Sequence, residues 1–156
     1  MPEPSSYRAP HCRCSLRGPF KVMLTYEETP CVCLECDGLI SLESLEIPEN
    51  HRLELIAWHR EYNAVHTLLY ESGVYSTWAR QELHDINSPI NESGRLLSAG
   101  LAEAFQVYYA FDPDNDPPPT SCPRCSGEIE PLPAHETAGP ACKACCIIFP
   151  PPDKSA

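Results

Sequence analysis

The cysteines are the residues of this chain whose type and spacing best support a defined chemistry. Two Cys-x-x-Cys pairs, Cys122 with Cys125 and Cys142 with Cys145, are separated by sixteen residues. Four thiolates at this spacing are typical of a tetrahedral zinc site, and a closed four-cysteine site leaves no coordination position open for catalysis. The spacing therefore predicts a structural zinc ion within a zinc ribbon. Two disulfides, or four unrelated buried thiols, are the alternative.

A second cysteine cluster near the N-terminus repeats part of this pattern. The segment 33–38 has the same Cys-x-x-Cys-x-Gly form as the segment 122–127. The repeat predicts a second zinc knuckle that Cys12 and Cys14 complete, with His11 or Cys31 as possible substitutes for one of them; unligated buried thiols are the alternative. The roles of Cys31 and Cys146 stay open, and Cys146 is expected to be a packed thiol. The predicted metal ligands are Cys122, Cys125, Cys142, Cys145, Cys12, Cys14, Cys33 and Cys36.

The segments around the cysteines predict both strands and helices. Strands are expected over 20–26, 39–47, 107–111 and 146–149, where β-compatible residues cluster. Apolar residues recur every three or four positions from Leu55 to Leu69, which predicts a long helix after Pro48 with Asn50 as its cap. A short helix over 77–84 should follow, and Ser88-Pro89 should start a third that runs to about Phe105.

These elements predict an α+β protein that zinc stabilises in place of a large hydrophobic core. We expect an N-terminal zinc knuckle with strands over 1–48 and a three-helix region ending in a strand over 49–111. An acidic, proline-rich linker over 112–120, a C-terminal zinc ribbon over 121–150 and a tail over 151–156 complete the predicted organisation.

The net charge of the chain limits which partners it can bind. Eleven basic residues stand against 22 acidic ones, which gives a formal net charge of -11. Each four-thiolate zinc site would add about two further negative charges. Nucleic-acid binders usually present a basic surface, because phosphate neutralisation supplies much of their affinity. The charge therefore favours a basic protein partner, although acidity that only aids solubility is the alternative.

The cysteine pattern and the apolar segments suggest a compartment. Residues 1–20 lack the apolar core of a signal peptide, and no apolar run is as long as a membrane-spanning helix. Clustered thiols are better explained by metal binding in a reducing cytoplasm than by a disulfide framework. We therefore expect a cytoplasmic protein that binds Zn2+ and has no membrane partner.

The sequence gives little support for catalysis. It contains no P-loop, His-Glu-x-x-His, Gly-x-Ser-x-Gly or glycine-rich dinucleotide motif. His59 and His66 share one face of the predicted long helix, but Glu61 is offset from that face. Trp58 and Tyr62 have the spacing of core residues rather than of a stacking platform. We predict no enzyme, no catalytic residue and no small-molecule substrate.

The order of motifs resembles one bacterial family. Cys33-Leu34-Glu35-Cys36, Trp58-His59-Arg60-Glu61-Tyr62, Ser93-Gly94-Arg95-Leu96-Leu97, Tyr108-Tyr109 and the two C-terminal cysteine pairs follow in that order. Over residues 33–149 the chain resembles the zinc-ribbon-containing proteins to which a nucleic-acid-binding role is attributed. The resemblance implies the architecture more than an activity, because that role looks like an inference from the ribbon. The pattern Cys12-x-Cys14 with Cys31-x-Cys33-x-x-Cys36 is also similar to glutathione-dependent formaldehyde-activating enzymes, whose mostly β fold a helical block over 52–105 would interrupt.

Charge and size together suggest a function. We expect a non-enzymatic zinc-binding protein that binds a basic protein partner, for instance an immunity protein or antitoxin that neutralises a bacterial toxin such as a nuclease or deaminase. The alternative is a nucleic-acid-binding regulator that uses the ribbon. The sequence does not give the partner's identity or the oligomeric state.

Overall fold

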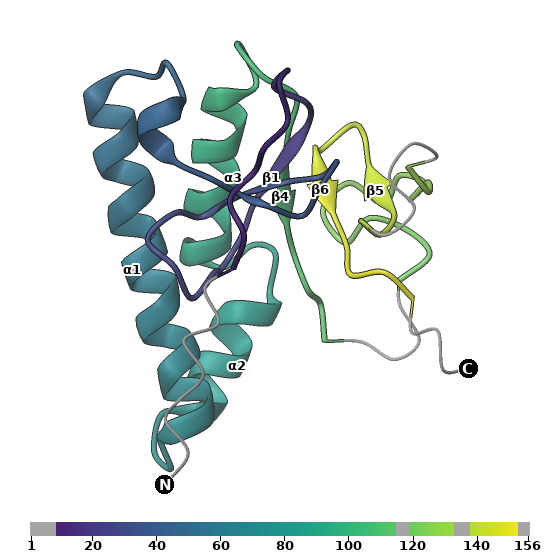
Figure 1. The fold of residues 1–156 in the computed structure, drawn as a ribbon. Helices are drawn as coiled ribbons and strands as arrows, with labels where there is room; N and C mark the ends of the chain where they lie inside the picture. The colour runs from purple at the N-terminus through teal and green to yellow at the C-terminus, as the bar shows by residue number, and fades with distance from the viewer. Residues whose placement is uncertain (1–8, 115–118, 133–137, 153–156) are drawn as a thin grey trace, which may run out of the picture.

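The six strands that the structure describes form one continuous sheet. The computed structural model describes residues 9–114, 119–132 and 138–152. Within them the strands lie in the order β3-β2-β1-β4-β6-β5, so both cysteine-rich ends of the chain contribute to a single sheet (Figure 1). The strands are β1 (Phe20–Val22), β2 (Cys31–Cys33), β3 (Leu39–Ile40), β4 (Val107–Ala110), β5 (Ala141–Cys142) and β6 (Ile147–Ile148).

The sheet is mixed, and its centre is parallel. β2 pairs antiparallel with β1 and β3, and β5 pairs antiparallel with β6. β1 pairs in parallel with β4, and β4 pairs in parallel with β6. Parallel neighbours need a long connection between them. The helical region supplies the connection before β4, and the C-terminal cysteine region supplies the one before β6.

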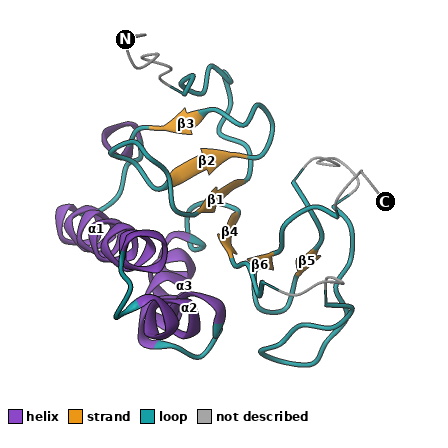
Figure 2. Ribbon diagram, turned by 90° about the horizontal axis from the view of Figure 1, so that it is seen from below, coloured by secondary structure: helices purple, strands orange, loops and turns teal. Residues whose placement is uncertain are grey.

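The helices cover one face of the sheet (Figure 2). They are α1 (Glu49–Glu71), α2 (Ser76–His84) and α3 (Pro89–Leu101), and a 3-10 turn, η1 (Leu42–Ser44), precedes them. The predicted apolar seam of the long helix is confirmed, since Leu55, Trp58, Val65 and Leu69 are buried. The Trp58 ring packs edge-on against Tyr109 at 5.9 Å, and its Nε1 donates to the Ile90 carbonyl at 2.9 Å. The α+β class predicted from the sequence is therefore confirmed.

A buried asparagine joins the helices to the sheet. Asn91 is fully buried on α3, and its Nδ2 donates to three carbonyls at the end of α2, those of Glu82, Leu83 and Asp85. Its Oδ1 accepts from the Tyr109 hydroxyl at 2.7 Å. Helix ends leave carbonyls without intrahelical partners, and a buried donor satisfies them here. One side chain thus fixes α2, α3 and β4 relative to one another.

Some predicted element boundaries need correction. Asn50 does not cap α1, because the helix begins at Glu49 with Pro48 in the cap position. The strand predicted over 39–47 ends at Ile40, and η1 begins at Leu42. The third helix ends at Leu101 rather than near Phe105. The predicted cap at Ser88 is confirmed, since its side chain accepts from the Asn91 N–H.

The predicted linker is described only in part, because residues 115–118 lie outside the described residues. In its first part the Asp114 carboxylate pairs with Arg80 at 2.8 Å, so this acidic segment contacts α2. No helix in the described parts of the chain has the length and apolarity needed to cross a membrane.

Candidate metal centres and an acidic groove

Two groups of four cysteines could each hold a metal ion. One consists of Cys12, Cys14, Cys33 and Cys36, and the other of Cys122, Cys125, Cys142 and Cys145. Within each group the four Sγ atoms all lie within 4.8 Å of one another. These are the eight ligands predicted from the sequence, and they form the two sets that the spacing predicts. Among the described residues, no other group of three or more His, Cys, Asp or Glu side chains has its potential ligand atoms this close together.

The sulfur spacing fits zinc. With Zn–S bonds of about 2.3 Å, a tetrahedral site places its sulfurs about 3.8 Å apart. The Sγ atoms of Cys14 and Cys33 are 4.0 Å apart, and those of Cys125 and Cys142 are 3.6 Å apart. All ten cysteines are free thiols, so the disulfide alternative is not the arrangement found. The clusters are consistent with two tetrahedral four-thiolate zinc sites.

The repeated segments 33–38 and 122–127 fold into the same knuckle. In the first, the Cys33 N–H donates to the Gly38 carbonyl at 2.9 Å and the Asp37 N–H donates to the Cys33 carbonyl at 3.0 Å. In the second, the corresponding bonds from Cys122 to Gly127 and from Ser126 to Cys122 are both 2.8 Å. The sequence repeat therefore produces a repeated structure, in which a tight turn brings both sulfurs of each pair to one side.

A third turn of this kind explains Cys146. The residue after the second cysteine has a positive φ in three cases: 55° at Asp37, 61° at Ser126 and 52° at Cys146. Cys146 is thus the turn residue that follows the pair of Cys142 and Cys145. Its Sγ lies 3.6 Å from the Lys143 carbonyl rather than within the cluster. Cys146 is exposed, so the prediction that it is a packed thiol is wrong.

The two residues offered as substitutes in the N-terminal site do not belong to it. Cys31 is fully buried on β2, and burial raises the pKa of its thiol to about 12. A thiol held in its protonated form by an apolar environment is a poor metal ligand and a poor nucleophile. His11 forms an isolated bridge with Leu39 and lies outside the cluster. The group with Cys12 and Cys14 is therefore the better candidate site.

The cysteines within each cluster differ in the pKa of their thiols. Hydrogen bonds, the strongest from the backbone of Cys14, lower the pKa of Cys12 to about 7 against the opposing effect of burial. The Gly127 N–H, 3.3 Å from Sγ, contributes most to lowering the pKa of Cys125 to about 7. By contrast, the pKa values of Cys14 and Cys142 rise to about 12, led by the hydrogen bond to Cys36 and by burial respectively. A bound cation would stabilise all four as thiolates and release the remaining protons.

One arginine lies beside each cluster. Arg17 donates from Nη1 to the Cys12 Sγ at 3.7 Å, and Arg124 donates from Nη1 to the Cys145 Sγ at 3.8 Å. A four-thiolate site that holds a divalent cation carries a net charge of about -2. Each guanidinium therefore offsets part of that charge. The contact of an arginine with each cluster could not be predicted from the sequence, because the arginines are close to these sulfurs only in the folded chain.

A groove about 500 Å³ in volume adjoins the N-terminal region, since His11 lines it. Its apolar lining includes Leu39, Leu42 and Ile56. Its charged lining consists of Glu27 and Glu28 from one loop, Glu43 from η1 and Arg52 from α1. These glutamates make no ion pair with any residue that the structure describes. The grouping of these glutamates could not be predicted from the sequence, because Glu27 and Glu28 are far in sequence from Glu43.

The loop that carries two of these glutamates is held by buried hydrogen bonds. The Thr25 N–H donates to the Nε2 atom of His59 at 3.2 Å, and the Thr25 hydroxyl donates to the Thr29 carbonyl at 2.6 Å. His59 is buried on α1, and burial lowers its pKa. The Nε2 atom also lies 3.1 Å from the Thr25 carbonyl oxygen, so it contacts both the donor and the acceptor of the Thr25 backbone. His59 therefore helps to hold this loop against α1.

In comparisons with known proteins, no family model, no curated protein and no solved structure matches the chain.

Proposed function

We propose that this chain is a non-enzymatic protein that zinc stabilises and that binds a basic protein partner in its acidic groove. The observation that carries the proposal is the combination of three exposed or half-exposed glutamates, Glu27, Glu28 and Glu43, with an apolar lining. A lysine or arginine side chain could place its aliphatic stem on this lining and its charge among the carboxylates. The formal net charge of -11 would accelerate the approach of such a partner.

The fixed geometry of the groove supports the same proposal. Thr25, Thr29 and His59 tie the loop of Glu27 and Glu28 to α1 and to itself. The Thr29 hydroxyl also donates to the Ile40 carbonyl of β3. A surface that is already ordered loses less conformational entropy when a partner binds.

The ribbon offers weaker support for the alternative, a nucleic-acid-binding regulator. Arg124 lies against the Cys145 thiol, and Lys143 pairs with Glu130 at 3.0 Å. Phosphate binding would have to compete with both of these contacts and with the overall negative charge. Protein binding is therefore the leading proposal. A more specific version of this proposal is an immunity protein or antitoxin that neutralises a basic toxin. Only the charge and the size of the chain support this version.

In this proposal the two zinc ions have a structural role. Each four-cysteine site is coordinatively closed, so a bound zinc would not have an open position for a substrate. The N-terminal knuckle immediately precedes β3, which supplies Leu39 to the apolar lining of the groove. Zinc at this knuckle would thus help to hold the binding surface in place.

The proposal can be tested with two variants that lose the same charge in different places. The groove variant changes Glu27, Glu28 and Glu43 to Gln. The control variant changes three other exposed glutamates, Glu61, Glu71 and Glu103, to Gln. Tagged wild-type and variant proteins would be used to capture partners from lysate of the host, with and without nuclease treatment. Bound proteins would be identified by mass spectrometry, and bound nucleic acid would be extracted and measured.

The outcomes separate the proposal from its alternative. We expect a basic protein on the wild type and the control variant and at least tenfold less of it on the groove variant, about the loss that removing charged interface contacts causes. Equal capture by both variants would exclude the groove as the binding site. Nucleic acid captured without nuclease, and no protein after its use, would favour the nucleic-acid regulator.

A further inference from the structure

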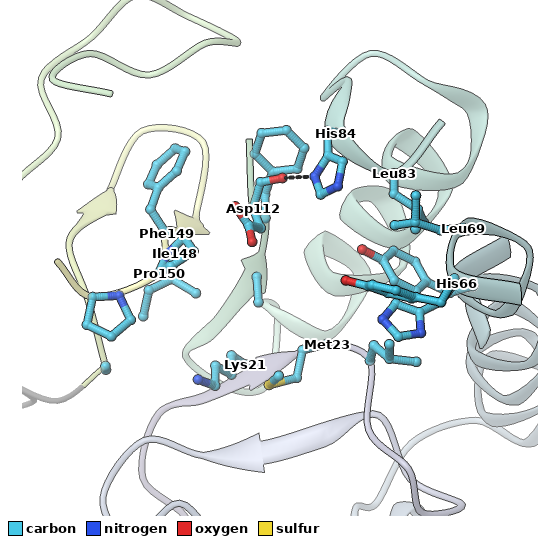
Figure 3. Close-up of a pocket in the computed structure, with 17 residues that line it drawn as sticks. Lys21, Met23, His66, Leu69, Leu83, His84, Asp112, Ile148, Phe149 and Pro150 are labelled. Atoms are coloured by element: carbon cyan, nitrogen blue, oxygen red, sulfur yellow. Dashed lines mark hydrogen bonds between the residues drawn. The ribbon is translucent and has the colours of Figure 1, made fainter. Parts of the chain in front are cut away.

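A second cavity, about 340 Å³ in volume, lies where three parallel strands end (Figure 3). β1 continues into Met23, β4 into Phe111 and β6 into Phe149, and all three residues line the cavity. In open sheets, crevices at the carboxyl ends of parallel strands are frequent ligand sites. The volume falls within the range of small-molecule pockets. The cavity shares no lining residue with the acidic groove, so its role goes beyond the proposed function.

The walls of the cavity are mainly apolar and aromatic. Leu69 and Leu83 from the helices face Ile148 and Phe149 from the ribbon across the open space (Figure 3). On the helical side the rings of His66 and Tyr70 lie 4.9 Å apart. The Tyr70 side chain is 73% exposed, so its ring is accessible from solvent. These walls suit a flat aromatic body.

Lys21 provides the polar contact. Lys21, on β1, lines the cavity and is half-buried, and it makes no hydrogen bond or ion pair with any residue in the described parts of the chain. Burial lowers the pKa of its ammonium group, while the charge of Asp37 acts in the opposite direction. A half-buried cation that makes no direct hydrogen bond or ion pair with a described residue can bind an anion favourably.

Two other polar residues of the cavity, His84 and Asp112, already make hydrogen bonds. The Nδ1 atom of His84 bonds with the Asp112 carbonyl at 2.8 Å, and the Asp112 carboxylate accepts from the Asp114 N–H at 2.8 Å. Asp112 also makes the rim on this side negative. An anionic group would therefore be directed to the Lys21 end rather than to the His84 end.

We propose that this cavity binds a small aromatic carboxylate, with its ring system between the helical and ribbon walls and its carboxylate at the Lys21 ammonium. The site is built jointly by β1, by the helical region and by β6 of the ribbon. Ligand binding would therefore join the ribbon to the rest of the molecule.

The probes for this proposal are 2-naphthoate and its uncharged analogue 2-naphthalenemethanol, each titrated into the full-length zinc-loaded protein. The chain has two methionines, so labelling the methionine methyl groups gives a readily assigned NMR signal from Met23 inside the cavity. We expect a saturable shift of this signal with naphthoate, and binding of the alcohol about tenfold weaker, as the loss of one charge-assisted contact implies.

Lys21→Leu should reduce naphthoate affinity about tenfold and leave the affinity for the alcohol unchanged. Arg60→Leu, which removes one positive charge from an exposed site on α1, should change neither. Failure of naphthoate to shift the Met23 signal in the wild-type protein would overturn the proposal, as would equal affinity for the two probes. The wild-type comparison holds even if the Lys21 variant folds poorly.

Discussion

At the scale of single residues, the buried His59 helps to hold the loop that carries two glutamates of the acidic groove. Because burial lowers its pKa below the ordinary value of 6.5, the unfolded chain binds a proton at a pH where the folded chain resists it. The free energy of unfolding should therefore fall as the pH drops from about 6.5 towards the folded-state pKa, by at most about 1.4 kcal/mol per pH unit from this group.

This prediction is checked by urea unfolding of the wild type and of His59→Leu between pH 7 and pH 5. Protonation of the zinc ligands affects both proteins, so the difference between the two pH slopes isolates His59. We expect a shallower slope for the variant. Identical slopes would mean that His59 is not held neutral by burial.

Two adjacent cysteines provide a second test at this scale. Cys145 belongs to the C-terminal cluster, whereas Cys146 occupies the positive-φ turn position and is exposed. Cys145→Ser should therefore reduce the bound zinc from two ions per chain to about one, and Cys146→Ser should leave two. Zinc content by atomic absorption distinguishes these outcomes. Loss of zinc from the Cys146 variant would show that Cys146 is a ligand.

At the scale of elements, the N-terminal site depends on a close approach of two segments. A Cβ atom at Gly38 would lie 2.6 Å from the Cys12 nitrogen and 2.7 Å from its Cα, too close for any side chain. Gly38→Ala should push the Cys12 segment away and destabilise the protein by about 1–3 kcal/mol, the usual cost of overpacking. Gly73 has open space around it, so Gly73→Ala is the matched control, with an expected change of at most about 0.5 kcal/mol.

Thermal unfolding of both glycine variants, together with their zinc content, checks this prediction. The Gly38 variant should melt at a lower temperature and lose zinc from the N-terminal site alone. If both variants matched the wild type, the close packing of Gly38 against Cys12 would be wrong.

What the sequence predicts about these elements follows from how local each signal is. The repeated Cys-x-x-Cys-x-Gly form predicts a knuckle because a few consecutive residues determine the turn, and the seam of α1 is predictable from helical periodicity. The end of the strand at Ile40 is not predictable in this way, since Leu42 and Leu45 are buried by the 3-10 turn η1 instead of by a longer strand. The exposure of Cys146 also depends on its turn, which its adjacency to Cys145 conceals.

At the scale of the whole molecule, the two cysteine modules are parts of one sheet. β4 lies between β1 and β6, so the ribbon extends the sheet that begins in the N-terminal region. Sequence reasoning could not predict this order, because strand pairing between residues far apart leaves no periodic signal. For the same reason it could not find the acidic groove or the cavity, each of which combines loops and helices from distant segments.

The most direct test of the account is the mass of the intact protein under native conditions, after expression in zinc-containing medium. Two structural zinc sites predict the mass of the chain plus two zinc ions, less the protons that the zinc ions displace, with all ten cysteines free of disulfides. Denaturing the same sample should give the zinc-free mass without the loss of hydrogens that disulfides cause. A metal-free native mass, or a denatured mass that indicates disulfides, would contradict the account.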